Sequence, residues 1–460
     1  MALDAGAAFF PHPYLIKSRQ KNAERTAEGI GRAMAAMHIG AIGVSPFDLA
    51  AGADFLNDLG RKNKLPLLSA NLFPAHGTNP LFRPYILRKT GNMTIAVIGL
   101  TGKPQQEQAQ EKFHILPWTQ TLPGIMDEVT HKADLVILLS SYAQKTNEKI
   151  AERYKDINII FEAGQGGGNQ MPININNTLL CRVTAKGKYV GVMQIDWNSS
   201  KTWGDNSPDR LKKSTNRLDR INWQLSRMQK RHPAKELAGN LQYQRLVKGK
   251  QELEQLIKTL TEKKDSSLSL CRYKNTFVAM ETNLPKDKAV TAIVDQTKRE
   301  VNMINRRQQQ ERQRRKKQGK TTDNSGISAI ITSMAGSRAC KKCHPAQVAF
   351  YLQTDHARAW QTLIDKNQQY NPDCIGCHVT LPSHNLQANR RGDLFADIPA
   401  KLHNVGCESC HGPALEHSQK PESILPAKPQ QTTCRRCHTQ KRDRNFDYSK
   451  KIIKVKCPAG

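Results

Sequence analysis

Four copies of the motif Cys-x-x-Cys-His lie in the last third of the chain, and each could attach one c-type haem. Two cysteines three positions apart can form thioethers to the two haem vinyl groups, and the histidine that follows can bind the iron. The predicted attachment residues are Cys340, Cys343, Cys374, Cys377, Cys407, Cys410, Cys434 and Cys437, and the predicted proximal iron ligands are His344, His378, His411 and His438. We number the motifs 1 to 4 along the chain.

Zinc is the alternative for these cysteine pairs, because two such pairs can close a tetrahedral thiolate site. The histidines favour haem. Only 14 of the 460 residues are histidine, so one directly after all four pairs has a chance of about one in a million, whereas haem attachment requires it. The pattern therefore predicts four c-type haems as the cofactors, with the haem iron as the metal.

Each of the four irons also needs a sixth ligand, and the same region contains four further histidines. We rank them as distal ligands in the order His356 and His417, then His403, then His384. The equal count allows every haem to be six-coordinate with two histidines, which suits electron transfer. If one histidine fails, its haem is five-coordinate and could bind a small molecule such as nitric oxide or hydroxylamine.

The haem-bearing segment is short for four cofactors. About 125 residues cannot build a conventional core beside four porphyrins, so we expect the macrocycles themselves to form the core. The expected packing residues around them are Phe350, Trp360, Leu363, Val379, Leu394 and Phe395. Closely packed porphyrins form a conduction path, which favours an electron carrier over an enzyme, and no catalytic residue is assigned.

The net charge of +30 is concentrated in the middle of the chain. Residues 201–320 carry 30 Lys and Arg against 13 Asp and Glu. We expect acidic partners or anionic surfaces, and in particular redox proteins that are acidic or are themselves multihaem cytochromes. No recognisable nucleic-acid-binding module accompanies the charge, and no apolar run reaches membrane-spanning length.

Covalent haem chemistry and the cysteine content indicate the cellular compartment in which the protein matures. Covalent haem attachment takes place outside the cytoplasm, so we expect a periplasmic or extracellular protein. The first ten residues, MALDAGAAFF, do not resemble a signal peptide, and we expect the natural start to lie upstream. The cysteines outside the motifs, Cys181, Cys271 and Cys457, are expected to be free thiols or one bridge plus one thiol.

The hydrophobic pattern divides the chain into four segments. Residues 1–200 alternate strand-like and helix-like runs and predict an α/β domain, with hairpin turns at Thr90-Gly91-Asn92 and at Lys186-Gly187. Residues 205–265 follow heptad spacing broken at Pro233 and predict a basic, antiparallel, coiled-coil-like helical hairpin. Residues 266–325 are expected to be a small mixed segment and a charged linker, and residues 326–460 a mostly helical or irregular haem domain.

The haem region resembles a known family. The runs ACKKCHPAQ, TDHARAW, PDCIGCHVT, NVGCESCHGPALEH and TCRRCH are similar to the tetrahaem cytochrome c family typified by the electron acceptor of hydroxylamine oxidoreductase, over residues 337–448. The resemblance implies stacked haem pairs, mostly with two histidine ligands, and places His356 and His417 at distal-ligand positions. Residues 450–460 depart from the family because they offer no histidine.

The first 200 residues resemble the metallophosphoesterase domain of periplasmic nucleotidases, through LDAGAAFF, AIGVSPFDLAAGADFLNDL, LPLLSANL, IAVIGLTG, LVILLSS, IIFEAG and KYVGVMQIDW. Members of that family bind two metal ions through a GD turn, a GNHE turn, a histidine after the LLS strand and a GHxH turn. The matching positions here are Gly6-Ala7, Gly43-Val44-Ser45-Pro46, Ser141 and Gly164-Gln165-Gly166-Gly167. Hydroxyl, amide and aliphatic groups cannot hold two divalent ions, so we expect a retained scaffold rather than a phosphatase.

These observations favour an exported multihaem cytochrome that passes electrons between redox partners, and assembly of copies into oligomers or filaments is compatible with them. Two other functions stay open. A haem-based oxidoreductase of hydroxylamine or nitrogen oxides would need a five-coordinate haem. A metal-dependent nucleotidase with an attached cytochrome would need the metal ligands that the four turns have lost.

Overall fold

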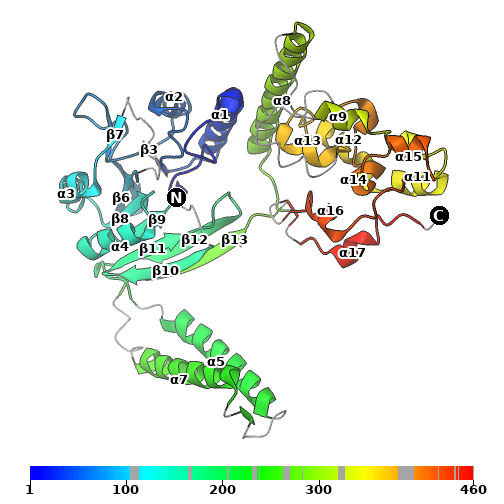
Figure 1. Ribbon diagram of the computed structural model, residues 1–460. Helices are drawn as coiled ribbons and strands as arrows, with labels where there is room; N and C mark the ends of the chain where they lie inside the picture. Colours follow the sequence, from blue (N-terminus) through cyan, green and yellow to red (C-terminus); the bar gives the residue numbers. More distant parts are fainter. Residues whose placement is uncertain are drawn as a thin grey trace. The chain divides into compact units, whose positions relative to one another are not determined.

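A six-stranded sheet with the order β10-β11-β9-β8-β6-β5 forms the centre of the N-terminal region in the computed structural model (Figure 1). The structure describes residues 1–103, 113–163, 168–204, 207–229, 236–237, 239–262, 270–281, 283–319, 327–381, 398–422, 424–439, 442–443 and 445–458. The chain divides into two units, of which the first contains residues 1–13 and 39–285 and the second contains residues 14–38 and 286–460.

The strands of the first unit are β1 (Leu3–Asp4), β2 (Ala41–Gly43), β3 (Leu67–Leu68), β4 (Leu72–Pro74), β5 (Tyr85–Thr90), β6 (Met93–Leu100), β7 (Phe113–Ile115), β8 (Leu135–Ser140), β9 (Ile159–Glu162), β10 (Gln170–Ile175), β11 (Thr178–Arg182), β12 (Tyr189–Asp196) and β13 (Arg272–Ala279). Its helices are α2 (Ala53–Asn63), α3 (Trp118–Val129), α4 (Gln144–Arg153), α5 (Ser207–Gln229) and α7 (Leu241–Glu262). Strands β6, β8, β9 and β11 run parallel, and β5 and β10 flank them antiparallel.

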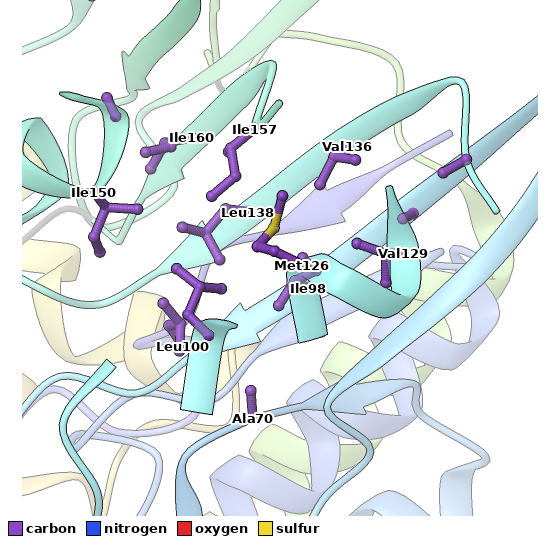
Figure 2. Packing of buried hydrophobic residues seen from close by; sticks show 14 of the residues in the cluster. Ala70, Ile98, Leu100, Met126, Val129, Val136, Leu138, Ile150, Ile157 and Ile160 are labelled. Carbon is purple, nitrogen blue, oxygen red and sulfur yellow. The ribbon is translucent and has the colours of Figure 1, made fainter. Parts of the chain in front are cut away.

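Both faces of the six-stranded sheet are buried, which explains why β8 is apolar along its whole length. Side chains of α3 and α4, such as Met126 and Ile150, pack against Leu138 and Ile160 on one face (Figure 2). On the other face, Ala41 and Leu68 from the three-stranded sheet β1-β2-β3 pack against Ile137 and Leu139. This arrangement confirms the α/β class expected for the N-terminal region.

One predicted hairpin is confirmed and the other is wrong. Strands β5 and β6 pair antiparallel across Gly91, whose φ of 59° suits the turn. Lys186 and Gly187 also form a turn, but the strand after it does not return to β11. Instead β12 pairs over its full length with β13, and β11 is enclosed between β10 and β9. Since β11 is occupied on both edges, β12 finds its partner much later in the chain.

The segment between β12 and β13 contains the predicted helical hairpin. Helices α5 and α7 lie side by side and project from the strand pair (Figure 1). Leu225 and Leu253 are buried between the helices, and the Gln229 side chain donates a hydrogen bond to the Tyr243 hydroxyl at 2.9 Å. The apolar stripe of each helix is therefore covered by the other helix.

The second unit is helical. It contains the 3-10 turns η1 (Lys17–Arg19), η4 (Asp355–Arg358) and η6 (Ala400–Leu402), and the helices α1 (Gln20–Ala36), α8 (Lys288–Lys317), α9 (Ile327–Thr332), α10 (Ser337–Cys340), α11 (Pro345–Leu352), α12 (Ala359–Asp365), α13 (Pro372–His378), α14 (Cys407–His411), α15 (Leu415–Gln419), α16 (Gln431–Arg435) and α17 (Tyr448–Ile452). Residues 308–317, which belong to the segment expected to include a charged linker, continue α8.

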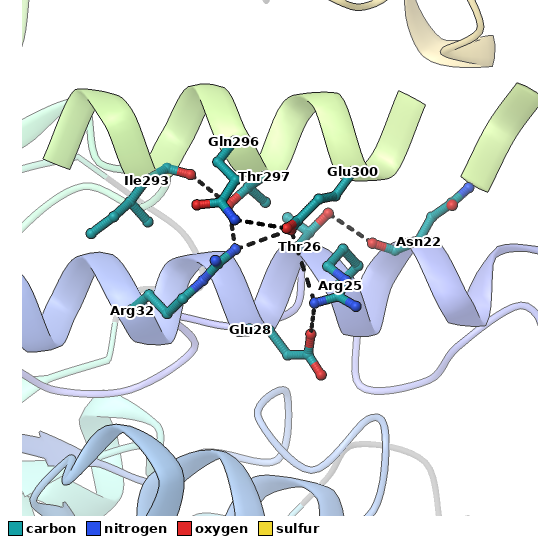
Figure 3. Close-up of polar contacts among 9 residues, drawn as sticks. All are labelled: Asn22, Arg25, Thr26, Glu28, Arg32, Ile293, Gln296, Thr297 and Glu300. Atoms are coloured by element: carbon teal, nitrogen blue, oxygen red, sulfur yellow. Dashed lines mark hydrogen bonds and ion pairs between the residues drawn. The ribbon is translucent and has the colours of Figure 1, made fainter. Parts of the chain in front are cut away.

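Helix α1 packs along α8, so residues 14–38 group with the second unit although the sequence pattern suggested the first domain. The helices approach closely because Gly29 has no side chain; a Cβ atom there would lie 2.3 Å from Thr297 Oγ1. Arg32 donates to Glu300 at 3.1 Å (Figure 3). Asn22 donates to Asn305 at 2.6 Å. The sequence showed an amphipathic segment at α1 but not its partner.

Candidate haem-attachment sites

Each of the four motifs lies in or next to a short helix of the second unit. Motifs 2 and 3 fall within α13 and α14, whereas the first cysteines of motifs 1 and 4 fall in α10 and α16. In motif 1 the backbone N–H of His344 donates to the Cys340 carbonyl at 2.9 Å, and in motif 4 that of His438 donates to the Cys434 carbonyl at 3.0 Å. This helical turn places the two cysteines and the histidine on the same side of the chain.

Two motif histidines face the two histidines that we ranked first as distal ligands. The ring centroids of His344 and His417 lie 6.3 Å apart, with an angle of 23° between the ring planes. The ring centroids of His438 and His356 lie 6.2 Å apart. The structure therefore brings together one proximal and one distal candidate for motif 1 and for motif 4.

These separations fit an iron bound between the rings. A metal-bound imidazole nitrogen lies about 2 Å from the metal, so two imidazoles on opposite sides of one ion have ring centroids roughly 6 Å apart. Aromatic rings in direct contact also have centroids about 4.5–7 Å apart, so the spacing is compatible with an iron between the rings but does not require one. The spacing of both pairs therefore allows axial ligands on opposite faces of a haem, and these residues fit the group.

Hydrogen bonds orient four of the histidines through Nδ1. His378, His411 and His417 donate to the carbonyls of Ala359, Ala427 and Ile424 at 2.6, 3.0 and 2.6 Å, because a carbonyl can only accept. The Nδ1 atom of His438 bonds to Asp443 Oδ2 at 2.9 Å. Metal-binding histidines usually donate their second nitrogen in this way, which leaves Nε2 with its lone pair for the metal.

The other two distal candidates have different positions. The His403 ring stacks on Trp360, with centroids 4.0 Å apart and an angle of 17°, and burial lowers its pKa. His384 lies outside the described residues. Within the described part of the chain, no histidine ring faces His378 or His411. Assignment of distal ligands to motifs 2 and 3 stays a prediction.

Cysteines of different motifs lie in contact. The thiols of Cys340 and Cys407 share a hydrogen bond, which lowers the pKa of Cys407 to about 6. A hydrogen bond between Cys377 and Cys437 likewise lowers the pKa of Cys377 to about 7. Motif 1 therefore adjoins motif 3, and motif 2 adjoins motif 4. Haems tethered at these sulfurs would be attached at neighbouring points.

A buried carboxylate that the sequence analysis passed over connects motif 1 to motif 3. Glu408, only 1% exposed, lies between the two cysteines of motif 3. One of its oxygens accepts from the N–H groups of Ala335 and Ala414, at 2.9 and 2.8 Å, and the other accepts from Gly336 at 2.8 Å. Gly336 precedes α10, which carries Cys340. The sequence feature that could have indicated this role is the acidic residue between the two cysteines of motif 3.

A small apolar core supports the motifs. Leu363 and Val379, both expected to be packing residues, are buried with Met334, Ile375 and Leu402, and Trp360 packs against them. Phe350 is half-buried, and Leu394 and Phe395 lie outside the described residues. The described protein core of this region therefore lies beside motif 2, which includes Ile375.

The first unit holds serine hydroxyls at two of the turns that match metal-binding turns of the metallophosphoesterases it resembles. Asp48 accepts from the N–H groups of Ala7, Ala8 and Phe9 and from the Ser45 hydroxyl. Ser141 accepts from the N–H of Gly102 at 2.8 Å. The fourth turn, residues 164–167, lies outside the described residues. Across the described chain, no group of three His, Cys, Asp or Glu side chains is arranged to hold a metal ion.

The comparisons with known proteins divide the chain in the same way. Residues 339–412 match the family model described as "Cytochrome c554 and c-prime". That match contains motifs 1 to 3 and ends before motif 4. Cytochrome c-554 of Nitrosomonas europaea is 33% identical over 94 residues, which cover 17% of this chain and 37% of the relative. Cytochromes of the c type hold haem covalently through such cysteines.

The remainder resembles metallophosphoesterases. The uncharacterized metallophosphoesterase YunD of Bacillus subtilis is 29% identical over 143 residues, 30% of each chain. The chain thus spans about a third of the length of these two curated relatives. The solved structure of calcineurin-like phosphoesterase YfkN from Bacillus subtilis aligns with a TM-score of 0.42 at 15% identity, over 65% of this chain and 83% of that one. Sulfate thiohydrolase SoxB of Thermus thermophilus aligns with a TM-score of 0.38 at 19% identity, over 43% and 36%.

No helix among the described residues combines the length and apolar character needed to cross a membrane. Both expected resemblances, to a cytochrome c family and to metallophosphoesterases, are confirmed by the sequence relatives.

Proposed function

We propose that the protein is an exported c-type cytochrome that transfers electrons between redox partners through four covalently bound haems. The observation that carries the proposal is the pairing of motif histidines with distal histidines at a separation of 6.2–6.3 Å. An iron held between two imidazoles has no open coordination position for a substrate, so it exchanges electrons without binding one. Motifs 1 and 4 have this character.

Contacts between motifs support electron exchange within the protein. The cysteine contacts join motif 1 to motif 3 and motif 2 to motif 4. A third relationship links the two pairs: burial raises the pKa of Cys410 in motif 3, and the nearby Cys434 thiol of motif 4 raises it further. Haems attached at these points would form one connected series. Electrons could then cross the unit from one end of the series to the other.

The proposed location and partners follow from the chemistry. Covalent attachment of haem takes place outside the cytoplasm, which places the mature protein in the periplasm or outside the cell. The excess of Lys and Arg favours partners with acidic surfaces, including other multihaem cytochromes. Association of copies into oligomers or filaments would extend the haem series and belongs to the same proposal.

A spectroscopic redox titration of the purified holoprotein tests this function. We expect stepwise reduction of low-spin haems, with no change in the spectrum when nitric oxide or hydroxylamine is added. The alternative, a haem-based oxidoreductase, is favoured by one observation: no histidine ring faces His378 or His411 in the described part of the chain. A high-spin haem that binds nitric oxide and turns over hydroxylamine would establish that alternative.

The nucleotidase alternative has a separate test. Phosphate release from nucleotides in the presence of manganese or zinc would support it. We expect none, because Ser45 and Ser141 stand where the family has metal ligands and both hydroxyls are already hydrogen-bonded within the fold. In this proposal the first unit is a scaffold.

A further inference from the structure

The four motifs differ in the two residues between their cysteines. Motifs 2 and 3 have Ile375 and Glu408 there, which are 4% and 1% exposed. Motif 1 has Lys341 and Lys342, and motif 4 has Arg435 and Arg436, and all four of these cations are exposed. A haem tethered at two such cysteines would have its thioether edge near the residues between them. At motifs 1 and 4 those residues are exposed cations, so a haem held there would have its edge beside a positively charged surface.

An open groove of about 800 Å³ lies beside motif 4. Its lining includes Arg435, Phe446, Asp447, Tyr448, Lys450 and Lys451. The side chains of Arg435, Lys450 and Lys451 are the cations of this lining. Asp447 is the acidic group, and it is already engaged by the Ser449 hydroxyl at 2.6 Å and by the Lys450 ammonium at 3.8 Å. The groove is thus a positively charged, partly aromatic surface.

One wall of the groove leads directly to a predicted iron ligand. Phe446 stacks on the ring of His438, with centroids 4.6 Å apart and an angle of 20°. His438 is the predicted proximal histidine of motif 4, and the ring centroid of His356 lies 6.2 Å from it. A protein seated in the groove would therefore be separated from the haem ligand by a single aromatic side chain. A short path of this kind favours rapid electron transfer.

We propose that this groove is the docking site of an acidic redox protein, and that electrons enter or leave the haem series through motif 4. The inference rests on the proposed electron-transfer function and adds the place of exchange. Transient redox complexes use small interfaces in which opposite charges guide encounter. Three cations around two aromatic rings provide such an interface for a partner with clustered carboxylates. The groove is too open to enclose a small inorganic anion.

The test measures the reduction of the full-length holoprotein by a reduced, acidic flavodoxin in a stopped-flow instrument. The groove variant combines Arg435→Glu, Lys450→Glu and Lys451→Glu. The matched control combines Arg88→Glu, Lys89→Glu and Lys188→Glu, which reverses three exposed cations of the first unit, away from the haem motifs, and changes the net charge equally. At low salt we expect the bimolecular rate constant to fall at least tenfold in the groove variant and less than twofold in the control. The difference should shrink at high salt, where charges are screened.

Two further measurements keep the outcomes separate. The rate constant for reduction by the small flavin lumiflavin should be similar in all variants. If neither flavodoxin nor lumiflavin reduces the wild-type protein, the proposed electron-transfer function is itself wrong. A second groove variant has glutamine at the same three positions, which removes the charges without reversing them. Its rate constant with flavodoxin should fall less, and this milder change distinguishes lost docking from misfolding. Equal loss in the groove variant and the control, or no loss in either, would overturn the docking proposal. So would a groove variant that loses binding to anionic phospholipid vesicles while its reduction by flavodoxin is unchanged.

Discussion

The imidazole rings of His344 and His417 face each other with their centroids 6.3 Å apart. His344 follows the cysteines of motif 1, and His417 lies in α15, beyond motif 3. The Nδ1 atom of His417 donates to the Ile424 carbonyl, which leaves the Nε2 lone pair for a metal. This relationship connects a local attachment motif to a ligand distant in the sequence, and it is the basis of the first prediction.

Replacing His417 by alanine should convert one low-spin haem to a high-spin, five-coordinate haem, because the iron of motif 1 loses its distal ligand. The other haems should keep their spectra. His356→Ala should do the same at motif 4. Electron paramagnetic resonance of the oxidised holoproteins measures both changes, and His131→Ala, an exposed position in the first unit, is the control. An unchanged low-spin signal in His417→Ala would show that His417 is not a ligand.

Replacing Glu408 by glutamine should lower the free energy of unfolding of the haem unit by about 2–3 kcal/mol. The reason is that three backbone N–H groups donate to the carboxylate, and a glutamine amide would turn N–H donors toward one of them. Urea unfolding followed by the Soret band measures the loss. Exposed Glu416→Gln in α15 is the control, with an expected change below about 0.5 kcal/mol. Equal stability of Glu408→Gln and the wild type would refute the role of this carboxylate.

The stability of the first unit should fall as the pH rises from about 4 to about 6. Removal from water raises the pKa of Asp4 to about 6 and also raises the pKa of Asp48. Between the ordinary pKa of an aspartate and the raised value, the folded state holds a proton that the unfolded state has lost, so raising the pH favours unfolding. For Asp4 the effect amounts to at most about 3 kcal/mol.

Denaturant unfolding followed by tryptophan fluorescence measures this pH dependence, because Trp197 and Trp203 pack together in the first unit. Asp4→Asn should flatten the pH profile, since asparagine keeps an oxygen for the Gly6 N–H but has no proton to lose. Asp127→Asn, at an exposed position, should leave the profile unchanged. A profile in Asp4→Asn as steep as in the wild type would exclude Asp4 as the titrating group.

Gly29→Ala should destabilise the second unit by about 1–3 kcal/mol, despite the better helix propensity of alanine. The added Cβ would lie 2.3 Å from Thr297 Oγ1 and would force α1 and α8 apart. Gly124→Ala in α3 is the matched control, because no atom lies within 4 Å of the position of its Cβ. That control should raise stability by roughly 0.5–1 kcal/mol. Thermal unfolding followed by circular dichroism distinguishes the two outcomes.

The sequence predicted best what depends on neighbouring residues. Haem attachment needs two cysteines and a histidine within five positions, so the four motifs are visible without a structure. The turn at Gly91 and the heptads of α5 and α7 are similarly local. The α/β class followed from alternating apolar and helical runs, because β8 and its neighbours are buried on both faces.

Features that depend on packing between distant segments were not visible. Strand β13 is separated from β12 by the whole α5–α7 hairpin, so nothing near Lys186 indicated that pairing. The partner of α1 was missed because an amphipathic helix shows that it has a buried face but not what covers it. The role of Glu408 was missed for the same reason, since its three donors come from two other segments.

The most direct test of the account is to measure the intact mass and the visible spectrum of the exported, mature protein together. The account predicts a polypeptide heavier by four haem groups, a Soret band, and a pyridine haemochrome that counts four c-type haems per chain. The double variant Cys434→Ala, Cys437→Ala should carry one haem fewer by both measurements. This variant tests motif 4, which lies outside the match to the cytochrome family model. An unmodified mass without Soret absorption would contradict the account and would favour thiolate sites for zinc at the same cysteines.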